Sequence, residues 1–281
     1  MIHSDWHIHS EYSYDASLPL DTLIKTATEQ GLYKFGVTDH ANFNDEKFMS
    51  DLRASAENVL NVQKICPSLI LGVELTPVPK PEIDYIAKTG TRDGYIPPIS
   101  NSPYDIEMAA TKAELIALGV RYAIGASHWR ADIFEGKKHH TDLDACIKEW
   151  YRQQMWLAQD ERVTILGHPW YIGNSIWYED FSVIPRSMNL DIAAAVKENS
   201  KYVECNSHFF TCERATEKFR AQYAEFLREL FEMGIRITYG SDCHGGRDGI
   251  YGDARPMVEK YLSKAGFCDG DISEISEKDL W

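Results

Sequence analysis

Histidines and carboxylates recur along the chain in short motifs, and each motif ends a stretch rich in β-forming residues. The motifs are His7-Ile8-His9, Thr38-Asp39-His40, Gly72-Val73-Glu74, Ser127-His128, Gly167-His168-Pro169 and Ser241-Asp242-Cys243-His244. Six of the ten histidines in the chain stand in them. Imidazole nitrogens and carboxylate oxygens together suit zinc, manganese or iron. Because one tetrahedral ion needs fewer ligands than this, the pattern predicts two or three divalent metals that share a bridging carboxylate.

Any one of these histidines, taken alone, fits a hydrogen-bonded residue near the surface better than a metal ligand. Their shared position at the ends of predicted strands reverses that preference. In a strand, the side chains of His7 and His9 point to the same side. A joint metal-binding role explains all the motifs at once, whereas separate structural roles leave their common position unexplained.

The elements that must position these residues alternate between strand and helix. β-Rich runs predict strands at residues 2–7, 34–38, 69–74, 121–126, 163–167, 202–206 and 235–240. Helical spacing predicts helices at about 20–30, 46–65, 107–118, 142–159, 187–199, 213–233 and 254–265. Seven successive β–α units indicate a parallel sheet, and that number favours a closed barrel over an open sheet. Since parallel strands end on one face of a barrel, the motifs are expected to form one site.

One connection is long and rich in proline and glycine. Between Leu75 and Ile106 lie six prolines, a composition that disfavours both helix and strand. We expect a segment without regular structure that starts beside Glu74 and acts either as a lid or as a surface excursion. Residues 1–281 are then expected to form one domain that carries this lid-like insertion at about 75–106.

Charge and composition restrict the partners. The chain has 43 acidic and 29 basic side chains, a net charge of −14 that repels nucleic-acid backbones and anionic lipids. A small phosphorylated substrate remains compatible, because local metal charge outweighs the global field. The six cysteines form no C-x-x-C pair, and neither a secretory signal nor a long apolar run is present. We therefore expect a cytoplasmic protein with no membrane and no long nucleic-acid partner, whose oligomeric state the sequence does not predict.

The ordered set of motifs, with Asp5-Trp6-His7-Ile8-His9-Ser10 at its start, resembles the polymerase and histidinol phosphatase (PHP) family. The resemblance extends from His7 to His244. It implies an α/β fold, a distorted seven-stranded (β/α) TIM-like barrel with the metal site at the C-terminal ends of the strands. It also adds Asp15, in Tyr14-Asp15-Ala16, as a ligand; otherwise this residue is a carboxylate that precedes a helix.

The resemblance further implies how the ligands are shared among three metals. One metal would be surrounded by His7, His9, Glu74 and Asp242. Glu74 would bridge to a second metal held by His128 and His168, while Asp15, His40 and His244 would hold the third. Asn206, in Glu204-Cys205-Asn206, would have only a supporting role, and we expect the same of Asp5 and Asp39.

Such a site predicts metal-dependent hydrolysis of a phosphate monoester. A water between two divalent ions loses a proton near neutral pH and can attack phosphorus, so no catalytic side chain is expected beyond the ligands. Arg130 and Arg247 follow two of the motifs and are candidates to bind the phosphate, with ordinary surface arginines as the alternative. Cys243 lies between two predicted ligands and the sequence assigns it no base, so we do not assign it as a nucleophile.

The resemblance favours histidinol phosphate as substrate, which would place the enzyme in histidine biosynthesis. Zinc is the preferred metal, with manganese or iron as alternatives. A second possibility is a nucleotide or oligonucleotide phosphoesterase, although the acidic surface disfavours long polymers. A third is a metal-binding PHP domain without catalysis, which the complete ligand set disfavours.

Overall fold

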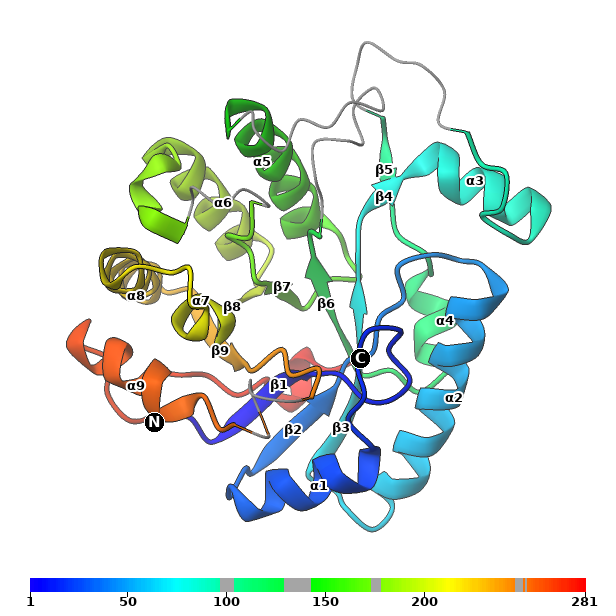
Figure 1. The fold of residues 1–281 in the computed structure, drawn as a ribbon, viewed down its shortest axis with the longest axis horizontal. Coiled ribbons are helices and arrows are strands. Elements are labelled where there is room, and N and C mark those ends of the chain that lie inside the picture. Colours follow the sequence, from blue (N-terminus) through cyan, green and yellow to red (C-terminus); the bar gives the residue numbers. More distant parts are fainter. Residues whose placement is uncertain (97–103, 129–142, 173–177, 246–249, 251) are drawn as a thin grey trace.

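Seven parallel strands form the centre of the computed structural model, which describes residues 1–96, 104–128, 143–172, 178–245, 250 and 252–281 (Figure 1). The strands are β1 (Ser4–Ile8), β2 (Lys34–Val37), β3 (Leu69–Leu75), β6 (Tyr122–Ala126), β7 (Ile165–Gly167), β8 (Tyr202–Asn206) and β9 (Arg236–Gly240). They are hydrogen-bonded in that order. The predicted strands are therefore confirmed, with ends that shift by one or two residues.

The barrel is closed by a seam between its first and last strands. Ile8 and Cys243 form a parallel bridge just beyond β9. The backbone N–H of His9 donates to the carbonyl of Cys243 at 2.9 Å, and that of Asp242 donates to the carbonyl of His7 at 2.7 Å. The expected (β/α) barrel is confirmed, and its closing hydrogen bonds lie among the predicted metal ligands.

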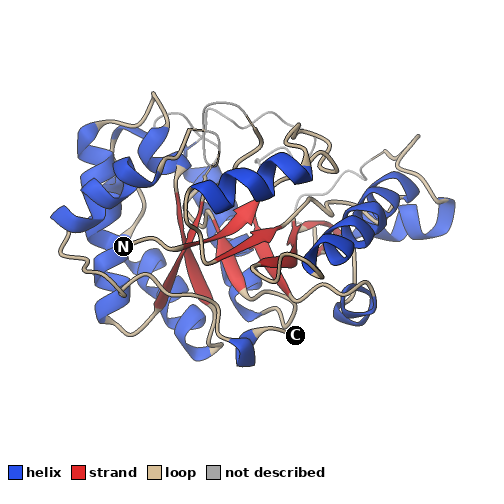
Figure 2. Cartoon of the chain, turned by 90° about the horizontal axis from the view of Figure 1, so that it is seen from below, coloured by secondary structure: helices blue, strands red, loops and turns tan. Residues whose placement is uncertain are grey.

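Helices cover the outside of the strands (Figure 2). They are α1 (Leu20–Glu29), α2 (Glu46–Gln63), α3 (Lys80–Thr89), α4 (Lys112–Ala117), α5 (Leu143–Gln159), α6 (Arg186–Glu198), α7 (His208–Thr211), α8 (Glu217–Glu232) and α9 (Arg255–Lys264). Side chains fix several helix starts, because Asp45 accepts from Phe48 N and Thr216 accepts from Phe219 N. No helix within the described residues has both the length and the apolar character to cross a membrane.

Inside the barrel, an aromatic cluster forms the floor beneath the strand ends. The Tyr122 hydroxyl donates to the Trp6 carbonyl at 2.7 Å, and the two rings meet edge to face. This tyrosine needs glycine on the neighbouring strands, because a Cβ at Gly36 would lie 1.8 Å from its hydroxyl and a Cβ at Gly72 only 2.6 Å from its ring. The glycines of β2 and β3 thus make room for a large side chain in a narrow barrel.

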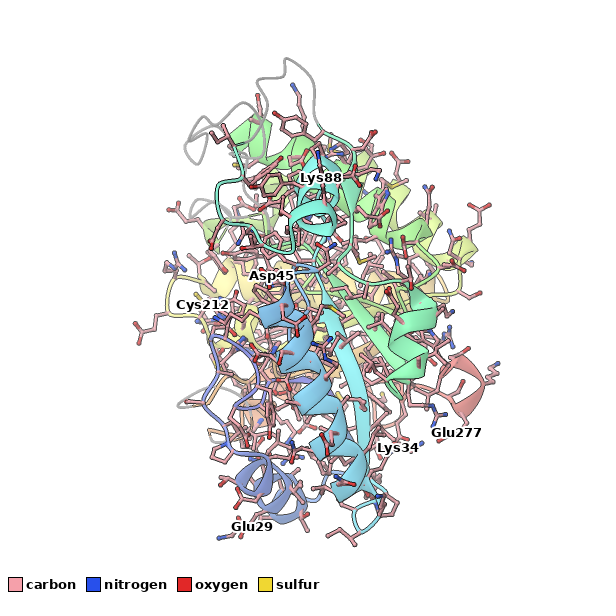
Figure 3. All side chains as sticks on the ribbon, turned by 90° about the vertical axis from the view of Figure 1, so that its right-hand side faces the viewer. Glu29, Lys34, Asp45, Lys88, Cys212 and Glu277 are labelled. Atoms are coloured by element: carbon pink, nitrogen blue, oxygen red, sulfur yellow. The ribbon has the colours of Figure 1, made fainter. Side chains whose placement is uncertain are left out.

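The expectation that residues 75–106 lack regular structure is wrong. A short strand β4 (Val78–Pro79) leads into α3, and β4 pairs with β5 (Ile106–Glu107) in antiparallel fashion. Pro81 lies in the first helical turn, where the missing N–H costs nothing, and Gly90 ends the helix at a φ of 80°. Figure 3 shows α3, marked by Lys88, beyond the N-terminal end of α2, marked by Asp45.

Two further helix boundaries differ from expectation. The helix expected at 107–118 begins at Lys112, because Thr111 and Glu114 form a capping box and residue 107 belongs to β5. The helix expected at 213–233 begins only at Glu217, after the Thr216 cap, and a separate short helix, α7, precedes it. The described chain otherwise follows the predicted alternation of strands and helices, which brings the C-terminal ends of β1, β2, β3, β6, β7 and β9 to one face.

Candidate metal centre

Four side chains from three strand ends meet at the centre of that face. His7 Nε2 lies 3.1 Å from His9 Nε2, 3.3 Å from Glu74 Oε2 and 3.4 Å from Asp242 Oδ1. His9 Nε2 lies 3.2 Å from the same glutamate oxygen and 3.3 Å from the same aspartate oxygen. Ligands about 2.0–2.1 Å from a tetrahedral ion are about 3.3–3.4 Å apart. Each of the two histidine nitrogens is therefore spaced from the other, and from the Glu74 and Asp242 oxygens, like ligands of one metal.

Glu74 also reaches a second group of donors. Its other carboxylate oxygen, Oε1, lies 3.2 Å from His168 Nε2 and 3.4 Å from His128 Nε2. The Glu74 side chain is fully buried. Its Oε2 lies 2.9 Å from His40 Nδ1, but no donor within the described residues is aligned to form a hydrogen bond with it. A buried carboxylate oxygen of this kind is costly unless a cation neutralises it.

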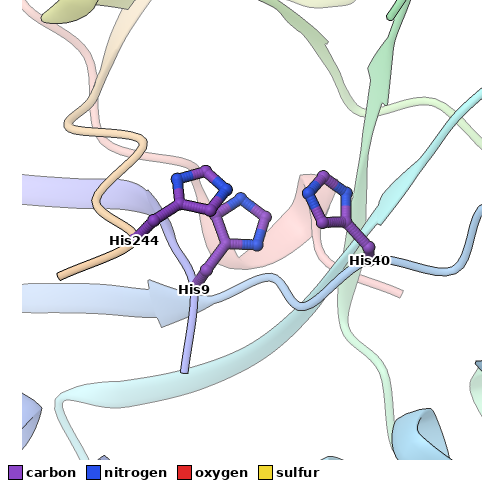
Figure 4. Close-up of side chains that lie close together, drawn as sticks. All are labelled: His9, His40 and His244. Atoms are coloured by element: carbon purple, nitrogen blue, oxygen red, sulfur yellow. The ribbon is translucent and has the colours of Figure 1, made fainter. Parts of the chain in front are cut away.

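A third group lies beside the first. Asp15 Oδ2 is 3.4 Å from His40 Nε2 and 3.6 Å from His244 Nε2. The His9 ring packs against both other imidazoles, with its centroid 4.4 Å from that of His40 and 4.1 Å from that of His244 (Figure 4). All the side chains predicted to bind metal thus lie together. Arg130 and Arg247 lie outside the described residues.

A pocket of about 310 Å³ opens over these side chains. Ligand-type residues line one part of it, namely Asp15, His40, His128, His168, Asp242 and His244. The rest is lined by Tyr171, Asn206, Ser207, His208, Phe209, Ser241 and Gly245. His7, His9 and Glu74 lie beneath the pocket and are inaccessible to solvent. A small molecule can therefore reach the predicted metal ligands from one direction.

The family follows from a comparison with known proteins. A family model described as the PHP domain matches residues 5–208. The chain belongs to the PHP family. The matched segment contains seven of the predicted ligands and ends before the remaining two, Asp242 and His244.

Two proteins described as phosphatases are similar to parts or all of the PHP chain. A protein described as a probable phosphatase, from Acetivibrio thermocellus, is 40% identical over 53 residues, which is 19% of this chain and 21% of that protein. The aligned part is thus about a fifth of that relative. The crystal structure of histidinol phosphate phosphatase from Lactococcus lactis subsp. lactis Il1403, complexed with zinc, L-histidinol and phosphate, superposes with a TM-score of 0.66. It is 17% identical and the match covers 99% of this chain and 98% of that one, which shows a common fold.

Neighbouring groups hold the second ring nitrogen of most histidines in the PHP centre. His7 Nδ1 lies 2.7 Å from Glu204 Oε1, and His9 Nδ1 lies 2.9 Å from Ser13 Oγ. His128 Nδ1 lies 2.7 Å from Thr76 Oγ1, and His244 Nδ1 lies 2.9 Å from the carbonyl oxygen of Asp242. Such contacts fix the tautomer and the ring orientation of a metal ligand. Each Nε2 is thereby directed at the shared centre.

Glu204 is a supporting residue that sequence analysis missed. Besides its contact with His7, it accepts from the backbone N–H of His168, and Asn206 Nδ2 donates to it at 3.2 Å. Asn206 Nδ2 also lies 3.2 Å from Asp242 Oδ2, which is the supporting position expected for this asparagine. The signal was the spacing Glu204-x-Asn206, because two residues apart on a strand they share a face.

Asp5 and Asp39 fix the backbone around the ligands, as expected. Asp5 Oδ1 accepts from the N–H of His7 at 3.2 Å and from that of Ser241 at 2.9 Å, so it ties β1 to the end of β9. Burial raises the pKa of Asp5 to about 6. Asp39 accepts from both the N–H and the hydroxyl of Ser10 at 2.7 Å, and so holds the loop after β1 against β2.

The three carboxyls of the centre stay ionised. Burial alone would raise the pKa of Glu74, but the nearby His40, His7 and His128 hold it well below its usual range. Burial likewise opposes ionisation of Asp242 and Asp15, and neighbouring histidines outweigh it in both, so both pKa values are lowered. The centre therefore keeps three ionised carboxylates that can neutralise bound cations.

The backbone is strained at two residues of the centre. Asp242 has a φ of 55° and His168 a φ of 26°, both in the left-handed region that residues other than glycine rarely occupy. Strain of this kind persists only where the surrounding contacts enforce it. Here Asp242 N is held by the His7 carbonyl and His168 N by Glu204. At these two positions the side chains of His168 and Asp242 reach Glu74 and His7.

Proposed function

We propose that this PHP protein is a metal-dependent phosphomonoesterase. The observation that carries the proposal is the shared position of Glu74, whose two oxygens face different groups of histidines at the base of one pocket. In this proposal the first metal is held by His7, His9, Glu74 and Asp242. Glu74, His128 and His168 hold the second, and Asp15, His40 and His244 hold the third.

Two observations support the fit of metals to these residues. In the first group, His7 Nε2 lies 3.1 Å from His9 Nε2 and 3.4 Å from Asp242 Oδ1, which is the spacing of ligands on one ion. The donor chemistry, imidazole with carboxylate, also suits zinc, manganese and iron. Zinc is the first metal to test, because the superposed phosphatase was crystallised with it.

When bound, divalent ions that share Glu74 would lower the pKa of a water between them and offset the charge of the phosphate oxygens. The residues of the chain position that chemistry. Thr76, Ser13 and Glu204 hold the ligand rings, so the site needs little reorganisation when substrate binds. Because His7, His9 and Glu74 are buried at the base of the pocket, the ester would approach them through the pocket. Arg130 and Arg247 remain candidates to bind its phosphate.

For the substrate we propose a small phosphomonoester, with histidinol phosphate as the first candidate. The support is the superposition of nearly the whole chain on a phosphatase whose structure contains L-histidinol and phosphate. The net charge of −14 supports a small substrate over a nucleic-acid polymer. Hydrolysis of nucleoside monophosphates is the competing outcome of the same assay.

The test is a substrate panel with protein reconstituted separately with zinc, manganese and ferrous iron. The panel contains histidinol phosphate, glycerol phosphate, AMP, p-nitrophenyl phosphate and the diester bis(p-nitrophenyl) phosphate. We expect phosphate release from monoesters, with histidinol phosphate fastest among the natural ones, and little diester cleavage. A protein that binds metal stoichiometrically but hydrolyses no monoester would contradict the proposed function.

A further inference from the structure

Hydrolysis of an alkyl phosphate needs a proton for the departing oxygen, and the metal ligands are poorly suited to give one. His128 and His244 have both ring nitrogens engaged, one with a carboxylate of the centre and the other with Thr76 or the Asp242 carbonyl. A histidine that binds metal through one nitrogen cannot act as a free acid through it. Among the described residues that line the pocket, the titratable side chains left unassigned are Tyr171 and His208.

His208 is held in the pocket by two different contacts. Its backbone N–H donates to Asn206 Oδ1 at 2.8 Å, and Asn206 Nδ2 in turn lies 3.2 Å from Asp242 Oδ2. This chain of contacts fixes the start of α7 relative to the metal centre. The imidazole is positioned separately, because its Nε2 lies 3.1 Å from the hydroxyl of Tyr178.

Tyr178 is suited to hold an imidazole in either protonation state. Only 3% of this tyrosine is exposed, and its ring packs against that of Phe219 with centroids 5.7 Å apart. Burial raises the pKa of Tyr178 above its ordinary value, so the phenol remains neutral. A neutral hydroxyl can donate to a bare ring nitrogen and can accept from a protonated one.

We propose that His208 donates the proton to the leaving-group oxygen, with Tyr178 as the positioning residue for its ring. This inference rests on the proposed function. As water attacks phosphorus, the bond from phosphorus to the ester oxygen breaks and its electron pair stays on that oxygen. The oxygen takes a proton from the His208 imidazolium and leaves as an alcohol. His208 regains a proton from solvent, so the net reaction is ester plus water to alcohol plus phosphate.

A comparison of two leaving groups tests the proposal. Alkyl phosphates such as glycerol phosphate need protonation, whereas p-nitrophenolate is stable enough to leave without it. We expect His208→Gln to lower kcat/KM for the alkyl ester by about 100-fold or more, which is the lower range for general acid catalysis. The same variant should change kcat/KM for the p-nitrophenyl ester by only about threefold. Metal content per chain should remain that of the wild type.

Three further variants make the test specific. Tyr178→Phe should lower kcat/KM for the alkyl ester by a smaller factor, and again by more than it lowers kcat/KM for the p-nitrophenyl ester. Tyr171→Phe removes the phenol of the other titratable side chain. It should keep the ratio of the kcat/KM values for the two esters. The matched histidine control is His3→Gln, since His3 stacks on Tyr33 and pairs with Asp269 outside the pocket, and it should leave both rates unchanged.

A second readout does not depend on activity. In ¹H–¹⁵N spectra of the metal-loaded protein, His208 should show one fixed tautomer, and Tyr178→Phe should shift its ring nitrogens. Equal loss on both esters in His208→Gln with normal metal content would overturn the inference, as would a Tyr171→Phe variant that alone loses the alkyl ester. Unshifted His208 resonances in Tyr178→Phe would overturn the positioning role. A wild-type chain inactive on every monoester would overturn the proposed function itself.

Discussion

Glu74 is the residue on which the centre most depends, because its two oxygens face different groups of histidines. We predict that Glu74→Gln lowers kcat by at least about 100-fold, since the amide keeps the shape but removes the bridging charge. The metal-free variant should melt close to the metal-free wild type. Enzyme assays, metal analysis and calorimetry provide the measurements.

Asp160→Asn is the control for that prediction, because Asp160 pairs with Arg162 just before β7 and away from the metal centre. It should keep both metal and activity. Full activity of Glu74→Gln with full metal content would show that the carboxylate does not bridge.

Protonation of the histidines should compete with metal. Burial opposes the charged form of His40, but Glu74 and Asp15 raise its pKa to about 10, and Asp242 and Glu204 help to raise that of His7. Both are therefore protonated in the metal-free protein at neutral pH and must lose protons to bind a cation. We predict that metal binding releases protons and tightens as the pH rises from 6 to 9. Calorimetric titration in buffers of different ionisation enthalpy measures the release, and a pH-independent affinity would refute it.

Gly240 leaves the room that Glu204 needs to contact His7. A Cβ there would lie 1.9 Å from Glu204 Oε1 and 2.7 Å from the Cβ of His7. We predict that Gly240→Ala displaces Glu204, costs about 1–3 kcal/mol of stability and weakens metal binding by about 10- to 100-fold. Thermal melting and competition with a chelator measure the two effects.

Gly266→Ala is the matched control for Gly240→Ala. Gly266 has a φ of 90° with nothing near its missing Cβ, so an alanine there strains the backbone without touching the centre. It should lose stability and keep metal affinity. If both variants bind metal equally well, Glu204 does not support the centre.

At the scale of elements, the sequence predicts most of the barrel because apolar residues recur at different spacings in strands and in helices. The bounds predicted for the strand at 202–206 are confirmed, because this β-rich run directly follows a predicted helix. Helix α3 was missed because prolines at 79 and 81 were read as breakers, whereas a proline in the first helical turn is tolerated. Position along one strand also could not reveal that Glu204 of β8 meets His7 of β1, a contact made only when the barrel closes.

The insertion between β3 and β6 is proposed as a lid. The Arg92 guanidinium lies 3.6 Å from the centre of the Phe43 ring and pairs with Glu82 at 2.7 Å, so the insertion is attached to the loop after β2. We predict that replacing residues 80–104 with a short Gly/Ser turn, which can close the β4–β5 pair, leaves metal content unchanged. It should reduce the differences in kcat/KM among monoesters, because lid contacts discriminate the organic group.

Arg92→Ala is the milder companion of that deletion. It removes the contact with Phe43 while keeping α3, and it should shift relative rates in the same direction by a smaller factor. Relative rates that stay unchanged in both variants would assign the insertion to a surface role.

At the scale of the whole molecule, the metals should fasten the seam between the first and last strands. His7 and His9 flank Ile8 on one side of this seam, and Asp242 and His244 flank Cys243 on the other. We predict that metal loading protects the amides of His9 and Asp242 from hydrogen exchange more than amides inside the β3–β6 ladder. Binding at 100 times the Kd adds about 2.7 kcal/mol to stability, which sets the scale of the effect. Uniform protection across the barrel would contradict a special role at the seam.

The same seam has a consequence for biosynthesis. In the first metal group, His7, His9 and Glu74 precede the fourth ligand, Asp242, by more than 160 residues of sequence. A ribosome that adds about 5–20 residues per second needs on the order of tens of seconds to travel between them. His7 and His9 therefore leave the ribosome long before Asp242 is synthesised. Complete loading with metal must therefore follow the synthesis of β9 and its pairing with β1.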